Sequence, residues 1–138
     1  MNNSTQGIES ILSAISSGNT TARAITEASV DAAESLNDQL NAFLQIDRAG
    51  ALRRASEIDA SNESDQPLRG VPIAVKDNIC VRGLQTSCGS RVLGPYQPPY
   101  NATAVDRLSA AGAVIIGKAN CDEFAMGSSN ERSNLTEN

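Results

Sequence analysis

The spacing of apolar residues predicts a helix at the start of the chain. Four of them recur at positions i, i+3, i+4 and i+7 and so share one helix face: Ile8, Ile11, Leu12 and Ile15. Ser4 or Thr5 is available to cap this helix, and Gly18 to end it. The chain is therefore expected to open with a short amphipathic helix.

Further apolar patterns predict two more helices and one extended stretch before residue 61. In order, these are a helix from Thr20 or Thr21 to about Leu36, a break at 37–38, an extended stretch at 43–46 and a helix over 47–60. Residues 61–66 form a polar linker. We therefore predict an N-terminal helical region over 1–66 and the start of an α/β core over 67–138.

From residue 67 the pattern becomes typical of strands. Residues 71–75 alternate, with Val71, Ile73 and Val75 on one face and Ala74 and Lys76 on the other. A helix is predicted over 104–111, with Thr103 as its N-cap and Gly112 as its end. An apolar strand follows over 113–116 and is closed by Gly117. A last helix is predicted over 121–126, with an Asn120–Glu123 capping box and Gly127 as its stop. Strand, crossover helix and strand in this order predict an α/β fold, with helices packed on a small parallel or mixed sheet.

Composition narrows the class of protein. The 138 residues suit one domain, and their net charge of -5 argues against a nucleic-acid surface, which needs clustered Lys and Arg. There is no histidine, and the three cysteines have no C-x-x-C spacing, so no metal site is predicted. No stretch resembles a signal peptide or a membrane span. These features predict a cytoplasmic protein with reduced thiols.

Lys76 is the candidate catalytic residue that the pattern itself singles out. It leaves an apolar strand beside Ala74, where it is expected to have little room to reach water. Such a lysine is either paired with an anion or kept neutral, and a neutral lysine is a base. The alternative is a strand-end lysine whose amine extends to solvent, and the local pattern leaves both open.

Other candidate sites match known chemistry poorly. Residues 112–118 have the spacing of a phosphate-binding loop, but Ala119 replaces the metal-binding hydroxyl and the intervening residues form a strand, so Lys118 is predicted to be structural or on the surface. Ser128 and Ser129 lie in a glycine-containing loop, but no neighbouring residue selects either as a nucleophile. Cys88 has no histidine partner, which argues against a cysteine hydrolase.

Three segments resemble the amidase signature family. In order they are 68–78 (LRGVPIAVKDN), 98–118 (PPYNATAVDRLSAAGAVIIGK) and 122–129 (DEFAMGSS). Within the family they are most similar to the A subunits of amidotransferases that act on glutamyl-tRNA(Gln) or aspartyl-tRNA(Asn). The resemblance extends from the helical N-terminal stretch to about Ser129. It implies the N-terminal portion of an amidase-signature-type fold, with the Gly/Ser-rich signature expected beyond Asn138.

The resemblance also implies roles for individual residues. The family uses a Ser–cis-Ser–Lys triad, in which Lys76 matches the lysine that acts as a base through a bridging serine. The nucleophilic serine attacks the side-chain amide of glutamine, and the released ammonia converts misacylated glutamyl-tRNA(Gln) to glutaminyl-tRNA. Met126, Gly127 and Ser128 match the loop near the substrate amide. Because both serines are expected outside this chain, the chain alone is expected to be inactive.

The same resemblance implies partners. Family members of this kind form a heterotrimer of A, B and C subunits, in which tRNA is bound mainly through the B subunit, and ATP and Mg²⁺ are used by the whole complex. No cofactor is expected in this chain itself. Two alternatives stay open: another amidase-signature hydrolase of a small amide, or a non-catalytic interaction module. The module would have to bury the apolar strand at 113–116 without the rest of the sheet.

Overall fold

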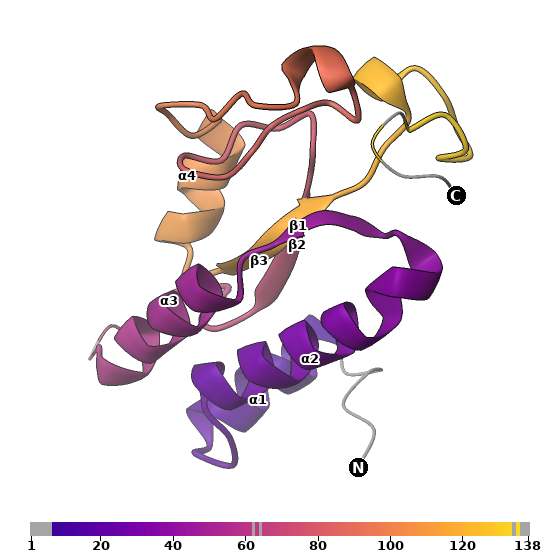
Figure 1. The fold of residues 1–138 in the computed structure, drawn as a ribbon. Helices are drawn as coiled ribbons and strands as arrows, with labels where there is room; N and C mark the ends of the chain where they lie inside the picture. The colour runs from indigo at the N-terminus through magenta and orange to yellow at the C-terminus, as the bar shows by residue number, and fades with distance from the viewer. Residues whose placement is uncertain (1–6, 62, 64, 134, 136–138) are drawn as a thin grey trace.

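The computed structural model describes residues 7–61, 63, 65–133 and 135. A three-stranded mixed sheet lies at the centre of this part of the chain (Figure 1). Its strands are β1 (Phe43–Ile46), β2 (Pro72–Lys76) and β3 (Val114–Ala119), in the spatial order β1-β3-β2. Strands β2 and β3 are parallel, while β1 is antiparallel to β3. This confirms the predicted α/β fold with a small mixed sheet.

Helices cover both faces of the sheet (Figure 1). The helices are α1 (Ile8–Ser16), α2 (Ala22–Leu40), α3 (Arg48–Ala60) and α4 (Thr103–Ala110), with single 3₁₀ turns η2 (Arg91–Leu93) and η3 (Glu123–Ala125). Val114 and Ile116 of β3 pack with α2 and α3, whereas Ile115 packs with the cluster that contains Val105 of α4. The alternation of strand side chains thus divides the core into two layers, one on each face.

The N-terminal helices largely agree with their predictions. Thr21 caps α2 by accepting from the amide of Ala24 at 3.1 Å, and Asp47 caps α3 by accepting from the amide of Gly50 at 3.0 Å. Gly7 occupies the N-cap position of α1 and makes no side-chain cap bond. The predicted caps Ser4 and Thr5 lie outside the described residues.

The predicted break at residues 37–38 is wrong, because α2 continues to Leu40. Asn37 stays in the helix and uses its side-chain amide to hold the next strand, accepting from Phe43 N at 2.8 Å and donating to Phe43 O at 3.0 Å. The helix ends where Asn41 adopts a left-handed conformation with φ 46°. Asn37 therefore connects α2 to β1, and Asn41 is the C-cap of α2.

The apolar strand predicted over 113–116 does not end at Gly117. Strand β3 continues through Gly117 and Lys118 to Ala119. At Gly117 the backbone of β1 lies so close that a Cβ would overlap the carbonyl oxygen of Gln45. The glycine is needed for this close approach of two backbones. The extension carries Lys118 into the strand and brings its side chain into the protein interior.

The two helix caps predicted in the second half are also wrong. Helix α4 begins at Thr103, with Ala102 in the N-cap position and no side-chain cap bond. Over 121–126 only the turn η3 forms, because Asn120 accepts from the amide of Cys121 rather than from that of Glu123. The amide of Glu123 instead donates to Arg132 O at 3.1 Å. This segment is a folded-back loop rather than a helix.

Strand β1 comes from the region predicted to be helical, and it forms one edge of the sheet. The predicted division at residue 67 stays a prediction. The apolar strand at 113–116 is largely buried between its neighbours, with Ala113, Val114 and Ile116 all buried. Within the described residues, no helix is both long and apolar enough to cross a membrane.

Candidate active site

The only two lysines of the chain lie at the carboxyl ends of the two parallel strands. In the register of β2 and β3, Val75 is opposite Lys118 and Lys76 is opposite Ala119. The two lysines are therefore one residue apart along the paired strands. Carboxyl ends of parallel strands are where α/β proteins place ligand-binding groups. Despite this proximity, the surroundings of the two amines are opposite.

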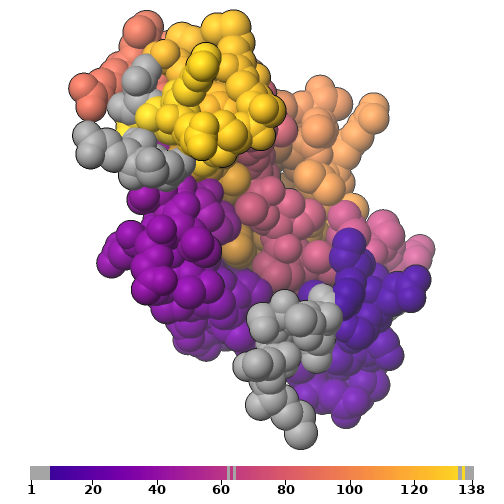
Figure 2. Space-filling view, turned by 90° about the vertical axis from the view of Figure 1, so that its right-hand side faces the viewer, coloured from indigo at the N-terminus to yellow at the C-terminus, as the bar shows by residue number. Residues whose placement is uncertain are grey.

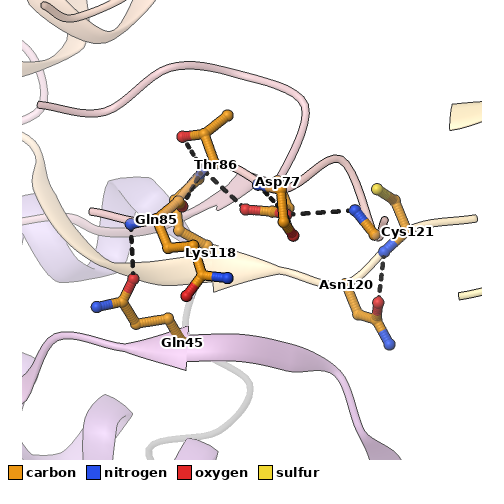
Figure 3. Close-up of polar contacts among 9 residues, drawn as sticks. Gln45, Asp77, Gln85, Thr86, Lys118, Asn120 and Cys121 are labelled. Atoms are coloured by element: carbon orange, nitrogen blue, oxygen red, sulfur yellow. Dashed lines mark hydrogen bonds and ion pairs between the residues drawn. The ribbon is translucent and has the colours of Figure 1, made fainter. Parts of the chain in front are cut away.

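Lys118 is completely buried, and all three of its ammonium donors have acceptors (Figure 3). Its Nζ donates to Asp77 Oδ1 at 3.0 Å, to Gln85 O at 3.0 Å and to Thr86 Oγ1 at 2.8 Å. A lysine ammonium has three donors and no acceptor, and this arrangement supplies one oxygen acceptor for each of the three donors. Lys118 is the structural lysine of the site.

Asp77 is the anionic partner of Lys118 and is also buried. Its second oxygen, Oδ2, accepts from Ser87 N at 2.9 Å, from Gly89 N at 3.4 Å and from the hydroxyl of Ser87. Its backbone amide donates to Ala119 O at 2.9 Å. Asp77 therefore ties the end of β2 to β3 and to the loop over 85–89, a role that the sequence analysis missed.

Lys76 is exposed, so the prediction that it has little room to reach water is wrong for this chain. The alternation is confirmed for residues 73–76: Ile73 and Val75 join the core layer of α4, while Ala74 and Lys76 occupy the other face. Val71 precedes β2 and is buried. That face of β2 is open to solvent at its carboxyl end. No hydrogen bond or ion pair of the Lys76 ammonium is found among the described residues.

Lys76 lines a cavity of about 410 Å³ beyond the ends of the strands. Most of the other lining residues come from the segment after β3: Asn120, Cys121, Asp122, Ala125, Gly127, Ser128, Ser129 and Asn130, with Ala42 from the α2–β1 connection. Figure 2 shows this last segment, in yellow, beside the purple α2–β1 region and rose-coloured residues of the second half. The fold thus brings Lys76 into one cavity with Gly127 and Ser128. Met126 is not among the lining residues and is 73% exposed.

Asp122 shapes the loop that lines this cavity. Its buried carboxylate accepts from the amides of Asn130 at 3.1 Å and Arg132 at 2.9 Å, which folds the loop back on itself. A Cβ at Gly127 would overlap the Asp122 carboxylate, so only glycine fits at this point. Sequence reasoning missed Asp122, although an acid followed by a loop rich in Gly, Ser and Asn is typical of side-chain to backbone bonding.

The thiols near the cavity are not activated nucleophiles. Burial raises the pKa of Cys121, and the negative charge of Asp77 raises it further, while Lys76 opposes the shift. Burial and Asp77 likewise raise the pKa of Cys88, with Lys118 opposing them. A thiolate is the reactive form, and a raised pKa lowers its fraction. This agrees with the sequence argument against a cysteine hydrolase.

The lining of the cavity therefore combines the Lys76 amine with the hydroxyls of Ser128 and Ser129. In the part of the chain that the structure describes, no hydrogen bond joins Lys76 to a serine, and Ser129 donates to Glu131 Oε2 at 3.0 Å. The residues described supply a candidate base without a relay to a nucleophile. No group of three or more Cys, Asp or Glu side chains suited to a metal ion occurs among them.

A family model described as Amidase matches residues 24–137. The match includes all three strands, both lysines and the cavity. This chain belongs to the amidase family. The amidase chain is 46% identical over 124 residues to the A subunit of the glutamyl-tRNA(Gln) amidotransferase of Salinibacter ruber, in an alignment that covers 88% of this chain and 24% of the relative. The chain thus spans about a quarter of the length of the curated relatives it matches.

Solved structures share the fold of this amidase chain. One of them is described as an unexpected vestigial protein complex that reveals the evolutionary origins of an s-triazine catabolic enzyme. It superposes with a TM-score of 0.89 at 34% identity, and the match covers 94% of this chain and 29% of that one. The A subunit of the glutamyl-tRNA(Gln) amidotransferase of Thermotoga maritima superposes with a TM-score of 0.74 at 33% identity, covering 94% and 26%. The chain therefore has the amidase-signature fold.

Proposed function

We propose that this amidase chain forms part of the A subunit of a glutamyl-tRNA(Gln) amidotransferase. In this role it contributes to the hydrolysis of glutamine, which supplies ammonia for the amidation of misacylated glutamyl-tRNA(Gln). The observation that carries the proposal is the 46% identity to such a protein over the region that forms the Lys76 cavity. An amidotransferase of this kind is a carbon–nitrogen ligase with glutamine as the amide donor.

Lys76 is the proposed base. Its amine accepts a proton that passes through a bridging serine from a nucleophilic serine, and that serine's oxygen bonds to the amide carbon of glutamine. Lys76 returns that proton through the bridging serine to the leaving nitrogen, the carbon–nitrogen bond breaks, and ammonia leaves. Water then cleaves the resulting ester, which releases glutamate and restores the serine hydroxyl. Both serines come from outside the described residues. Gly127 and Ser128 line the cavity in which the amide would lie, and Met126 is proposed to contact substrate from beside it.

The proposal includes partners beyond this chain. A, B and C subunits form the heterotrimer, with tRNA bound mainly by the B subunit. ATP and Mg²⁺ serve the complex as a whole, and the complex works in the cytoplasm. The acidic balance of this chain, with a net charge of -5, supports a location for the tRNA contact on another protein of the complex.

A segment exchange tests the proposed function. The chain replaces the matching segment of the Salinibacter ruber A subunit, which is co-produced with its partner subunits, and ammonia release from glutamine is measured. We expect the chimera to hydrolyse glutamine and Lys76→Ala to reduce the rate at least about 100-fold, as general-base loss does. Arg48→Met, at a residue outside the lining of the cavity, is the control for loss of a positive charge. A chimera that folds and assembles but keeps its rate after Lys76→Ala would refute the role of Lys76.

A second function is favoured by one observation. The peptide amidase of Stenotrophomonas maltophilia superposes better than the Thermotoga maritima protein does, with TM-scores of 0.83 and 0.74. The chain would then belong to a hydrolase of another small amide. The same chimera, assayed with a panel of small amides and with glutamine, separates the two: release of ammonia from a small amide but not from glutamine would favour the hydrolase.

The non-catalytic module is the remaining alternative. Such a module requires that strand 113–116 be buried without the rest of the sheet, and the strand is largely buried in this chain. A cooperative unfolding transition of the isolated chain would show that it folds alone. If the isolated chain showed such a transition and the chimera released no ammonia from any amide, the non-catalytic module would replace the proposed function.

A further inference from the structure

The segment after β3 folds into a closed loop over residues 120–133 (Figure 1). Its outer closure joins Ser133 to Asn120, because the Ser133 hydroxyl donates to Asn120 Oδ1 at 2.8 Å. Its inner closure is made by Asp122, whose carboxylate accepts from two backbone amides near the end of the loop. The bonded residues are eight to thirteen positions apart in the chain, so the two closures make the segment a compact surface loop.

The inner closure depends on one buried side chain. Asp122 is only 5% exposed, and its Oδ2 accepts from Asn130 N at 3.1 Å while its Oδ1 accepts from Arg132 N at 2.9 Å. Bonds from backbone amides to an ionised carboxylate are charge-assisted and about twice as strong as bonds between neutral groups. Gly127 lies against the same carboxylate, since a Cβ there would be 2.3 Å from Asp122 Oδ2. Asp122 therefore contacts both the returning side of the loop and its tip.

The tip of the loop, formed by Gly127 and Ser128, lines the cavity that Lys76 also lines. Both tip residues are exposed. Across the described part of the chain, no hydrogen bond of either tip residue is found. Their polar groups are therefore available to a ligand in the cavity, and their position depends on the closures at the base of the loop.

The backbone that leads to the tip has a shape that needs support. Phe124 and Ala125 have left-handed conformations, with φ values of 53° and 60°, which cost an L-residue energy. Ala125 N donates to Asp122 O at 2.8 Å, and Phe124 N donates to Cys88 O at 2.8 Å. Without the Asp122 closure, the loop is expected to relax out of this shape, and Gly127 is expected to move with it.

We propose that Asp122 is a positioning residue for the amide substrate: its carboxylate holds the loop so that Gly127 and Ser128 contact the substrate in the Lys76 cavity. This inference rests on the proposed function, in which these two residues line the site of the amide. The Asp122 carboxylate is turned to backbone amides and takes no part in the breaking of the carbon–nitrogen bond. It determines how tightly the substrate binds rather than how fast the bound amide reacts.

The test is the steady-state kinetics of ammonia release by the chimera with its partner subunits, with and without Asp122→Asn. Asparagine keeps one oxygen acceptor but places an NH₂ donor against the other backbone amide, so one of the two bonds is lost. We expect the KM for glutamine to rise roughly tenfold, as for loss of one charge-assisted bond, while kcat changes by less than about twofold. A merely structural defect would lower the fraction of active enzyme, and so kcat, and leave KM unchanged.

Asp59 offers a control of the same chemistry. Its carboxylate also accepts from two backbone amides, those of Ala22 at 2.8 Å and Arg23 at 3.0 Å, and it does not line the Lys76 cavity. Asp59→Asn therefore removes the same kind of bond at the start of α2, and the KM for glutamine is expected to stay at the wild-type value. If Asp59→Asn raised KM as much as Asp122→Asn does, the effect would be general and the inference would be overturned.

Hydrogen exchange in the same chimeras reports on the loop without any need for catalysis. The peptides that contain the amides of Asn130 and Arg132 are expected to exchange faster in Asp122→Asn than in the wild type, because a bond that protects them is lost. Where Asp122→Asn does not fold, Asp122→Ser takes its place. Its hydroxyl accepts from one amide and sets no donor against the other, so the expected rise in KM is smaller, about threefold.

The outcomes separate this inference from the proposed function. An unchanged KM in a folded, active Asp122 variant overturns the inference and leaves glutamine hydrolysis intact. A wild-type chimera that releases no ammonia from glutamine refutes the proposed function instead. In that case hydrogen exchange decides the role of Asp122: faster exchange at residues 130 and 132 in the variant supports its hold on the loop, and equal exchange overturns it.

Discussion

Lys76 and Lys118 lie one register position apart on adjacent parallel strands, yet one is open to solvent and the other is fully buried. Lys118 is surrounded by β1, β2 and the loop over 85–89, and each of its three donors has an oxygen acceptor. Lys76 lies on the face of β2 that the described residues leave open. The comparison shows that the neighbours of a strand end, rather than its own sequence pattern, decide what a lysine there can do.

The burial difference predicts a large difference in stability. Lys118→Met leaves the Asp77 carboxylate buried and unpaired, so the free energy of unfolding is expected to fall by about 3–5 kcal/mol. Lys76→Met removes an exposed amine and is expected to change it by less than about 0.5 kcal/mol. Denaturant unfolding of the two variants measures both values. Equal losses would contradict the assignment of Lys118 as the structural lysine.

Gly117→Ala sharpens the comparison by disturbing the strand that buries Lys118. The new Cβ would overlap the carbonyl oxygen of Gln45, so β1 must move away from β3. The expected loss is about 1–3 kcal/mol in the free energy of unfolding, as for overpacking elsewhere in cores. Gly94→Ala is the control, since residue 94 has a right-handed helical backbone and a Cβ there would come no closer than 3.3 Å to a neighbouring atom. If Gly117→Ala were as harmless as the control, the close approach of β1 would not be needed.

The smallest expected effect is the change in the free energy of unfolding with pH that the cysteine thiols cause. Because the folded chain raises the pKa of Cys88 and Cys121 above the ordinary value of 9.0, it favours their protonated forms. Their contribution to stability is therefore fully present below about pH 9 and is lost as pH rises through the raised pKa. We expect the free energy of unfolding to decline above pH 9 by more in the wild type than in Cys121→Ala. The same slope in both proteins would argue against the shift at Cys121.

The sequence predicted the fold better than it predicted the site. Helical spacing located α1, α2 and α3, and β-branched runs located β2 and β3, because these patterns follow directly from burial on one face. The end of α2 was missed because Asn37 bonds to Phe43, a contact outside its own helix. The extent of β3 was missed because glycine at residue 117 serves a neighbouring strand rather than a turn.

The motifs that resemble the amidase signature family singled out Lys76, Gly127 and Ser128, and the structure places all three around one cavity. The strand pattern, however, left open whether Lys76 is buried or extends to solvent, and it left Lys118 structural or on the surface. Whether a strand-end side chain is covered depends on segments distant in sequence, such as the Gln85–Thr86 loop that receives Lys118. Asp77 was missed for the same reason: its partners lie ten or more residues away.

The most direct measurement is competitive acylation of the two lysines in the native chain, quantified peptide by peptide. Lys76 is expected to be modified rapidly, while Lys118 stays protected until denaturant exposes it, because its ammonium is buried and bonded to three oxygens. Such a result supports Lys76 as the available base and Lys118 as its structural neighbour. Modification of Lys118 at the rate of Lys76 in the folded chain would contradict the central claim.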